Sequence, residues 1–518
     1  MKNTQLQNFQ QLWAFYQHFG IHKRKSDYSD KNIVSVFSEE CPYPVWHKDE
    51  WIENANPEGI IYDKNKDFWG QIWELFRKSP ISHNVWLWNE NSEYTDDCWY
   101  SKNCYLSHSL LKCEDSSYLF RTVNHKDCQF CVFSFDLQKC LDVIYGFDCY
   151  NIKYWIDVKR CKNSAFLFDC EDCEDCLLSW NLKNKKYCIA NKQYSKEDYK
   201  KEVKKYNLSS RKVYNKLIEQ FSNFIEKSAY WKEKHFDKVE KSRWDYLENC
   251  NNCDNCFYVE NWEDCKNWLR SLWVKNSENF VSIFNSEKVN NSVQVCDNCY
   301  NINYCFNIIE SKNLEYCGNC YKCENCFLSS WLVWKKFYIL NKKYSENEYN
   351  KLKFEIIENM KEKEIYWYFF PWYFSPTTYE ESCANSHCFL TLEEQKELWF
   401  RISNLEENKI ENLKNISELP DILTNENIEE VKWWYYDKFS KKPFAITDID
   451  ISFYKKTNSP INDKYYITRL KQNFSWMFPW AELRKTKCCI SGKNIETTLP
   501  KKLDSRIISL EEYEKIFY

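Results

Sequence analysis

Small side chains, above all cysteine, recur along residues 98–188 and 250–326 at spacings that are mostly multiples of three. The stretch 248–267 has no apolar stripe at helical spacing and is rich in Asn, Cys, Asp and Tyr, which are mediocre helix formers. Such a step returns one small side chain to one structural position again and again. We therefore expect a mainly β protein built on a parallel β-helix, or solenoid.

Cysteine marks this step most clearly. One run of cysteines covers Cys98 to Cys188 and a second covers Cys250 to Cys326. Residues 170–201 also align without a gap with residues 320–351, at an offset of 150 (320 − 170), and half of these 32 positions are identical. The sequence thus predicts two duplicated cysteine-rich solenoid sectors, whose successive coils lie about 4.8 Å apart.

Helical patterns flank and separate the two sectors. Residues 195–231 carry apolar positions at helical spacing, and Ser195 with Asp198 fits a capping box at their start. Residues 345–367 repeat this arrangement after the second sector. Further helices are expected over 5–19, over 68–80 and just after Thr391. We expect these helices to cap or flank the solenoid and to protect its open edges.

These patterns divide the chain into six expected segments. They are an N-terminal module with a degenerate ribbon and a helix (1–82), the first cysteine-rich solenoid sector (83–194), a helical hairpin (195–235), the second sector (236–344), a helix with a proline-containing linker (345–440) and a C-terminal degenerate ribbon-like module (441–518). Within the last hundred residues we expect small β-rich modules with one short helix each.

Charge and hydropathy narrow the functional classes. The formal net charge is −4 and the pI is about 6.2, so the chain has no bulk attraction for nucleic acid. The sequence shows no signal-peptide pattern at its start and no apolar run of 18 residues, so we expect neither export nor a membrane span. The 28 cysteines are then expected to be reduced thiols of a cytoplasmic protein, not a disulfide framework.

The glycine content is far below the usual share. The chain has 6 Gly and 24 Trp, where an average protein of this length would have about 36 Gly. Several Trp stand in polar segments that resemble turns, where Gly would supply positive φ. We interpret this as UGA recoding: many of these Trp stand for UGA codons that the cell reads as glycine. The alternative is a protein that is truly rich in Trp. The intact mass of protein from the native host would decide it.

Three clusters contain the CxxC spacing that zinc, iron–sulfur and thiol redox sites share. The candidate metal ligands are Cys170, Cys173, Cys176, Cys250, Cys253, Cys256, Cys317, Cys320, Cys323 and Cys326. The alternative is that cysteines stack inside the coils as small, buried, polarisable groups. Because cysteine recurs throughout both sectors and not in one cluster, we favour stacking and expect no cofactor, with zinc as the alternative.

Other candidate chemistry is weaker. Residues 383–388 bring Cys383, His387 and Cys388 together but lack a fourth ligand. The acidic pairs at 171–172 and 174–175 fit solvated turns better than catalytic acids. HExxH, GxGxxG and P-loop patterns do not occur.

Four long segments resemble a family of large uncharacterised bacterial proteins: 89–115, 181–199, 374–401 and 490–498. Members have cysteine-rich repeats and zinc-ribbon-like ends, and their pattern has Gly where this chain has Trp99, Trp244 and Trp399. Here Ser26 stands where a first ribbon ligand would be, and only Cys488 and Cys489 precede the C-terminal SGK, so we expect both ribbons to fold without metal.

Some members of this family are labelled CaiB/BaiF, which implies a CoA-transferase. That activity would need a Rossmann-like core and an aspartate nucleophile, and the repeats argue against such a core. We therefore expect a non-enzymatic solenoid scaffold that binds a protein or polymer partner. A metal-binding protein is the first alternative, and an enzyme acting along a solenoid groove rests on fold analogy alone.

Overall fold

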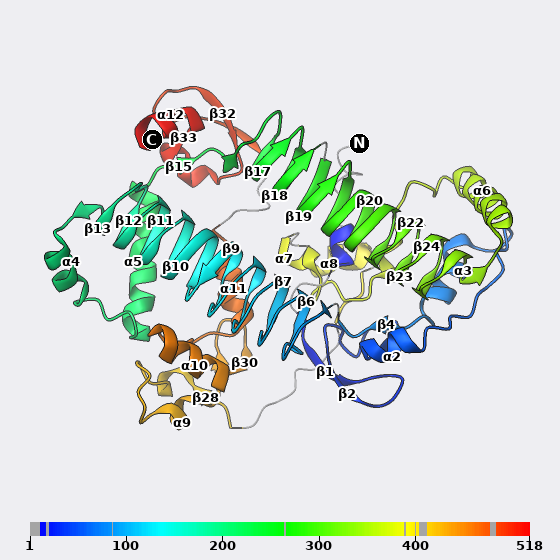
Figure 1. The fold of residues 1–518 in the computed structure, drawn as a ribbon, viewed down its shortest axis with the longest axis horizontal. Helices are drawn as coiled ribbons and strands as arrows, with labels where there is room; N and C mark the ends of the chain where they lie inside the picture. The colour runs from blue at the N-terminus through cyan, green and yellow to red at the C-terminus, as the bar shows by residue number, and fades with distance from the viewer. Residues whose placement is uncertain are drawn as a thin grey trace. The chain divides into compact units, whose positions relative to one another are not determined.

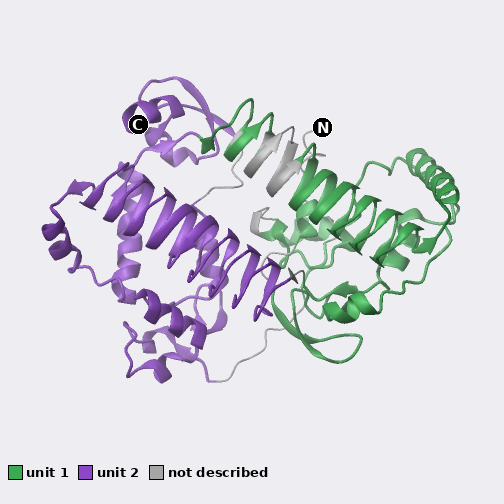
Figure 2. Ribbon diagram, viewed as in Figure 1, with its two compact units in different colours: residues 1–84, 234–405 green, residues 85–233, 406–518 purple. Residues whose placement is uncertain are grey.

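The structure is a computed structural model. It describes residues 11–16, 20–84, 86–263, 266–387, 390–398, 400–403, 412–476 and 483–517, with the backbone alone at 86–87, 244, 254–255, 257–274 and 386–387. The fold is mainly β, as the sequence predicts, and its two large sheets are predominantly parallel. Two compact units divide the chain, residues 1–84 with 234–405 and residues 85–233 with 406–518 (Figure 2). Each unit therefore joins segments that are far apart in sequence.

The second unit contains the first large sheet. Its strands are β5 (Trp86–Leu87), β6 (Thr95–Trp99), β7 (Ser107–Leu111), β8 (Phe120–Val123), β9 (Val132–Gln138), β10 (Leu141–Lys159), β11 (Lys162–Glu171), β12 (Glu174–Trp180), β13 (Lys186–Ile189) and β14 (Lys192–Gln193). From β5 to β13 the strands follow sequence order and pair in parallel (Figure 1). Each residue pairs with the residue twelve positions later, as in Trp86↔Cys98 and Glu174↔Lys186. This constant register of twelve is four steps of the three-residue pattern.

The first unit contains the other large sheet. Its strands are β16 (Phe236–Asp237), β17 (Trp244–Asn251), β18 (Asp254–Glu263), β19 (Lys266–Lys275), β20 (Glu278–Asn303), β21 (Phe306–Ile309), β22 (Lys312–Glu315), β23 (Gly318–Tyr321), β24 (Glu324–Phe327), β25 (Ser330–Val333), β26 (Lys336–Ile339) and β27 (Lys342–Lys343). The register is again twelve, except for Phe236↔Leu247 at eleven and Val293↔Phe306 at thirteen. The extra residue lies at 297–298, where two consecutive residues, Asp297 and Asn298, both have positive φ.

A left-handed residue recurs at nearly every third position along the fully described parts of both sheets. In β9 and β10, for example, Asp136, Lys139, Asp142, Tyr145 and Asp148 have φ between 49° and 57°. Asn and Asp tolerate this conformation best among non-glycine residues, which accounts for their abundance here. Among the described glycines, Gly492 has positive φ, and it lies outside both sheets. The left-handed positions of the sheets are therefore occupied by residues other than glycine.

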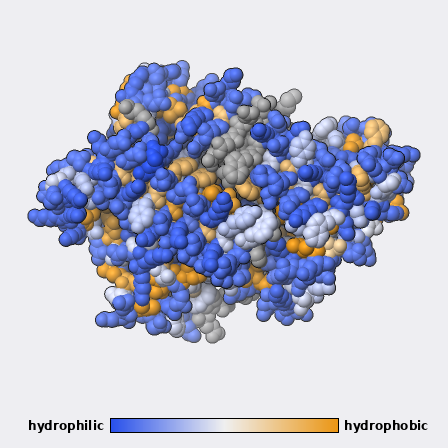
Figure 3. All heavy atoms as spheres, in the orientation of Figure 1, coloured by the Kyte–Doolittle hydropathy of each residue, from blue (hydrophilic) through white to orange (hydrophobic). Residues whose placement is uncertain are grey.

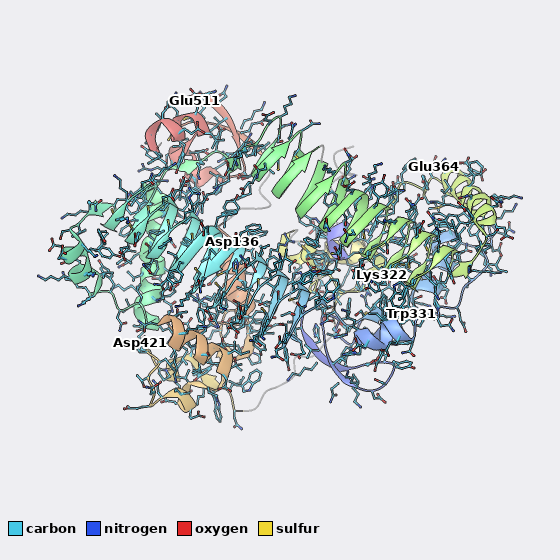
Figure 4. The ribbon with its side chains drawn as sticks, in the orientation of Figure 1. Asp136, Lys322, Trp331, Glu364, Asp421 and Glu511 are labelled. Carbon is cyan, nitrogen blue, oxygen red and sulfur yellow. The ribbon has the colours of Figure 1, made fainter. Side chains whose placement is uncertain are left out.

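Among the fully described residues, three tryptophans also stand at left-handed positions: Trp88, Trp331 and Trp334, with φ of 55°, 57° and 52°. Trp334 is 64% exposed, whereas Trp331 is buried beside α2 and donates a hydrogen bond from Nε1 to Trp51 O (3.0 Å; Figure 4). Tyr100 and Leu106 share the conformation. Positive φ therefore does not distinguish Trp from other side chains, and UGA recoding stays a prediction.

The duplicated segment forms the end of each sheet. Asn191 and Asn341 turn the chain back into an antiparallel strand, β14 or β27, and their Oδ1 atoms accept from Trp180 N and Ser330 N at 2.9 Å. Helices α4 (Lys196–Val203) and α6 (Glu346–Glu362) follow. Ser195 and Ser345 cap them, as predicted, by accepting the N–H of the residue three positions on. The duplicated segment thus ends both sheets in the same way, with an antiparallel strand and a capped helix.

Helices cover the first sheet within the second unit. They are α5 (Arg211–Ser228), α10 (Asp448–Thr457) and α11 (Tyr466–Phe474). Helix α9 (Ile428–Val431) lies before α10 in the same segment of the chain. Buried Asp142 of β10 accepts from Arg469 Nε at 2.8 Å and from Tyr214 Oη at 2.8 Å, which joins α11 and α5 to the sheet. Residues 422–463 carry two helices, α9 and α10, so the expectation of one short helix is wrong there.

The two ends of the chain fold alike. Hairpin β1 (His22–Lys25) with β2 (Asn32–Ser35) matches β31 (Arg484–Lys487) with β32 (Asn494–Thr497) at an offset of 462 (484 − 22). The same offset relates β3 (Val45–Trp46) and α2 (Lys48–Glu53) to β33 (Ile507–Ile508) and α12 (Leu510–Phe517). Strand β3 pairs in parallel with β4 (Ile81–Ser82), and β33 pairs in parallel with β15 (Trp231–Lys232). Each unit thus contains one such module.

The remaining elements are short. They are α3 (Phe68–Phe76), η1 (Trp372–Phe374), α7 (Cys383–His387), α8 (Leu392–Glu397), β28 (Lys414–Asn415), η2 (Ile416–Glu418), β29 (Trp434–Asp437), β30 (Lys442–Ala445) and η3 (Lys501–Arg506). Helix α3 buries Phe68, Ile72, Leu75 and Phe76, and α8 starts at the predicted cap Thr391. Most of the helix expected over 5–19 lies outside the described residues. Across the described part of the chain, no helix is long and apolar enough to cross a membrane.

Candidate functional site

The cysteines occupy core positions, which recur at every third residue inside each large sheet. In the second unit the core cluster runs from Cys98 to Cys188, and in the first unit from Leu247 to Leu332. Cys, Ser, Leu, Val and Ile alternate at these positions, and the cysteines in both clusters are at most 4% exposed. Because four core positions fall within each register of twelve, the CxxC spacing follows from the period of the fold.

The core side chains accept hydrogen bonds from backbone N–H groups that do not take part in strand pairing. Cys161 N donates to Cys149 Sγ at 3.1 Å, and Cys173 N donates to Cys161 Sγ at 3.3 Å. Serine does the same, since Cys113 N donates to Ser101 Oγ at 3.0 Å. In each pair the acceptor lies twelve residues before the donor, one strand back.

The first unit repeats this arrangement. Cys317 N donates to Cys305 Sγ at 3.3 Å and Cys323 N donates to Ser311 Oγ at 3.0 Å. The thiols in turn donate to carbonyl groups two residues earlier, as Cys305 does to Asn303 O at 3.1 Å. A small side chain with one donor and one acceptor therefore completes the backbone bonding at a core position, where a buried N–H without an acceptor would cost about 1–3 kcal/mol.

The ten predicted metal ligands all lie at core positions and are buried. They form three runs of successive core positions: Cys170, Cys173 and Cys176; Cys250, Cys253 and Cys256; and Cys317, Cys320, Cys323 and Cys326. In the last run, four successive core positions are cysteine. Within the ranges that the structure describes, no three His, Cys, Asp or Glu side chains come together as a group that could hold a metal ion.

Burial raises the pKa of most core thiols, whereas hydrogen bonds between neighbouring thiols lower the pKa of a few. Burial raises the pKa of Cys128, Cys140 and Cys149 well above the usual range, because a thiolate would lose its hydration. Burial also raises the pKa of Cys320 and Cys326, and neighbouring Cys317 and Cys323 raise it further. For Cys317 and Cys323 themselves, burial raises the pKa, but hydrogen bonds from neighbouring thiols outweigh burial and lower the pKa to about 5 and about 4. At neutral pH a neutral thiol is the species that suits Cys128, Cys140, Cys149, Cys320 and Cys326, and neutral thiols are poor nucleophiles and poor metal ligands. Cys317 and Cys323 are exceptions to this pattern.

The terminal modules hold the other candidate cysteines. Cys488 Sγ accepts from Ser491 N at 3.5 Å and Ser509 N at 3.4 Å. Burial raises its pKa, but hydrogen bonds from Ser491 and from backbone N–H groups outweigh burial and lower the pKa to about 7. In the N-terminal module Ser26 takes this place, as expected, and its Oγ accepts from Tyr28 N and His47 N. The side chain at the first ligand position of each expected ribbon thus accepts hydrogen bonds from two backbone N–H groups.

The remaining candidates are dispersed. Cys383 is buried in α7, while Cys388 and the side chain of His387 lie outside the described residues. The acidic residues at 171–174 form ion pairs with basic neighbours: Asp172 with Arg160 and Glu174 with Lys186, at 2.9 and 2.7 Å. These acids therefore neutralise adjacent cations on partly exposed strands.

One histidine at a core position was not singled out from the sequence. His125 is 1% exposed, and its Nδ1 lies 2.9 Å from Val123 O. Burial lowers its pKa to about 3, so the ring is neutral at physiological pH. Its place in the three-residue pattern, between Cys113 and Leu137 at steps of twelve, could have identified it as a buried residue.

Comparison with known proteins adds no assignment: no protein-family model matches the chain, and no curated protein matches it.

Proposed function

We propose that this protein is a non-enzymatic scaffold whose two large sheets are wound as parallel β-solenoids with twelve-residue coils. The constant register of twelve and the left-handed residue at every third position support this winding, because a four-sided coil needs a bend after every third residue. The coils would present rows of outward side chains, about 4.8 Å apart, to a protein or polymer partner.

The hydrogen bonding of the core cysteines carries this proposal. Their Sγ atoms accept backbone N–H groups and donate to carbonyls, so their chemistry is used by the fold. A scaffold role also fits Asp172 and Glu174, which form ion pairs with basic neighbours. The CoA-transferase implied by the family label has no supporting residue constellation and is not proposed.

The scaffold role is tested by quantitative pull-down from lysate of the native host with tagged full-length protein. We expect a partner retained in fixed ratio to the bait and displaced by excess untagged protein. Recovery of nothing above background would count against the proposal.

Soft-metal binding through the CxxC clusters is the second candidate function, and one observation favours it. Cys317, Cys320, Cys323 and Cys326 fill four successive core positions, which one coil would bring around a common axis. Stoichiometric zinc or iron in protein purified anaerobically, lost in Cys323→Ser and retained in the matched variant Cys161→Ser, would establish this function. Metal-free protein would remove it.

A further inference from the structure

One row of outward side chains runs the length of the first sheet. It is made of residues that pair in parallel at steps of twelve: Glu90, Lys102, Glu114, Lys126, Gln138, Tyr150, Lys162, Glu174 and Lys186. We call these nine residues the outward row. Neighbouring faces of the sheet are covered, since Gln129 contacts Asp450 of α10 and Phe120 packs on Phe474 of α11.

The outward row is exposed to solvent and charged. Glu90 and Lys102 are 62% and 48% exposed in their side chains, and Lys186 is 59% exposed. Neighbouring members form ion pairs at 2.9 Å between Lys102 and Glu90 and at 2.7 Å between Lys186 and Glu174. Hydrophilic residues also dominate the molecular face drawn in Figure 3. Exposed pairs of this kind contribute only about 0–1 kcal/mol each, so stability alone is a weak reason for such a row.

The order of charges in the row is antisymmetric. From Glu90 to Lys126 the signs alternate beginning with minus, and from Lys162 to Lys186 they alternate beginning with plus. The change of phase falls at Gln138 and Tyr150, the two uncharged members. Simple alternation would place like charges opposite each other when the row is reversed. The change of phase places opposite charges there instead.

We propose that the outward row is the contact surface of a homodimer, in which a second copy of this chain lies antiparallel about a two-fold axis at Gln138. Lys102 then faces Glu174 of the second copy, Glu114 faces Lys162, and Glu90 faces Lys186. Lys126 faces Tyr150, and Gln138 meets its own copy. By symmetry each charge pair occurs twice, which is the self-complementarity that a two-fold interface requires. This self-association goes beyond the proposed scaffold role and does not depend on an outside partner.

The second sheet provides an internal comparison. Its corresponding row reads Glu240, Asn251, Glu263, Lys275 and Glu287, followed by Tyr300, Lys312, Glu324 and Lys336. The last four members are identical to those of the outward row at an offset of 150 (300 − 150). Reversal, however, places the middle member Glu287 against its own copy. Reversal of this row also sets Glu240 opposite Lys336 and Glu263 opposite Lys312, but it leaves Glu324 opposite uncharged Asn251. The outward row is therefore the more self-complementary of the two.

The expected dimer is weak and sensitive to salt. Eight steps of about 4.8 Å make the row roughly 38 Å long, and its narrow face stays below the roughly 800 Å² per partner of a standard stable interface. Its attraction comes from exposed charges, which salt screens beyond a Debye length of about 8–10 Å. We expect dimer at low ionic strength and monomer at about 0.5 M salt.

Sedimentation equilibrium of the full-length protein, with a reductant to keep exposed Cys489 reduced, tests the proposal. Gln138→Glu and Gln138→Lys should both weaken dimerisation by about tenfold, because each places like charges face to face at the axis. Lys201→Glu on α4, a control outside the row, should change it by less than about twofold. A dimer strengthened by Gln138→Lys, or unaffected by both substitutions, would overturn the two-fold arrangement.

A charge-swap cycle gives an independent readout. Lys102→Glu and Glu174→Lys should each weaken dimerisation by about tenfold, and the double variant should recover the wild-type affinity. Within one chain these positions are six steps apart, about 29 Å, which is too far for direct coupling. Recovery therefore reports contact between copies. Additive loss in the double variant, or a wild-type protein that stays monomeric at low salt, would refute the dimer.

Discussion

Replacing Cys161 separates the two roles that a core cysteine combines, filling space and accepting a backbone hydrogen bond. Cys161 is fully buried, its Sγ accepts from Cys173 N at 3.3 Å, and it donates to Lys159 O at 3.4 Å. Cys161→Ala removes both the bonds and the volume. Cys161→Ser keeps one donor and one acceptor, as Ser101 does at an equivalent position.

The expected difference between these variants follows from the contacts. In Cys161→Ala the buried N–H of Cys173 loses its acceptor, at about 1–3 kcal/mol. The lost sulfur leaves a small void that adds about 1 kcal/mol. In Cys161→Ser the N–H keeps its acceptor, and the loss is confined to the smaller side chain, about 1 kcal/mol. We therefore expect the Ala variant to be less stable than the Ser variant by about 1–3 kcal/mol.

Two measurements check this order. Urea denaturation gives the free energy of unfolding, with equal m-values required before the variants are compared. Hydrogen–deuterium exchange of the peptide containing Cys173 gives a local readout, which does not depend on two-state unfolding of two units. The amide of Cys173 should exchange faster in the Ala variant than in the Ser variant.

Equal stability of Cys161→Ala and Cys161→Ser, with unchanged exchange at Cys173, would refute the reasoning. The core cysteines would then be space-filling groups, and the hydrogen bonds to sulfur would contribute nothing measurable.

Two other substitutions test packing and pH dependence. Asp142→Ala should destabilise the second unit by about 3–5 kcal/mol in thermal unfolding, because it leaves the buried Arg469 guanidinium without its carboxylate. The double variant Asp142→Leu with Arg469→Met should recover much of this loss. Equal instability of the single and double variants would contradict the account. His125 has a pKa of about 3 when folded and about 6.5 when unfolded, so the unfolded chain binds more protons between these values and stability falls as pH falls from about 6.5 to 3. His125→Leu should flatten this dependence by up to about 1.4 kcal/mol per pH unit in urea titrations, and an unchanged slope would refute the assignment.

The sequence predicts the periodic parts of this molecule well because their cause is local. The three-residue step of Cys98 to Cys188 becomes the row of core positions, and Ser195, Ser345 and Thr391 cap helices as their spacing predicts. The frequent Asn and Asp residues at left-handed positions belong to the same local pattern.

What could not be predicted depends on contacts between distant segments. Asp142 stands in the repeat like any other acid, and only the fold brings Arg469 and Tyr214 to it. The ten candidate ligands show that a local pattern can also be ambiguous. Their CxxC spacing is shared by metal sites and by any fold with a three-residue step, so spacing alone could not choose between the two.

The most direct test of the structural role of cysteine is a thiol count on reduced protein purified anaerobically, made before and after unfolding and combined with metal analysis. Among the described cysteines, Cys489 is exposed and Cys41 partly exposed, and the others are buried. We predict rapid reaction of these few in the native state, reaction of the core thiols only on unfolding, and metal far below one equivalent. Core thiols that stay protected until a stoichiometric metal is removed would contradict the account.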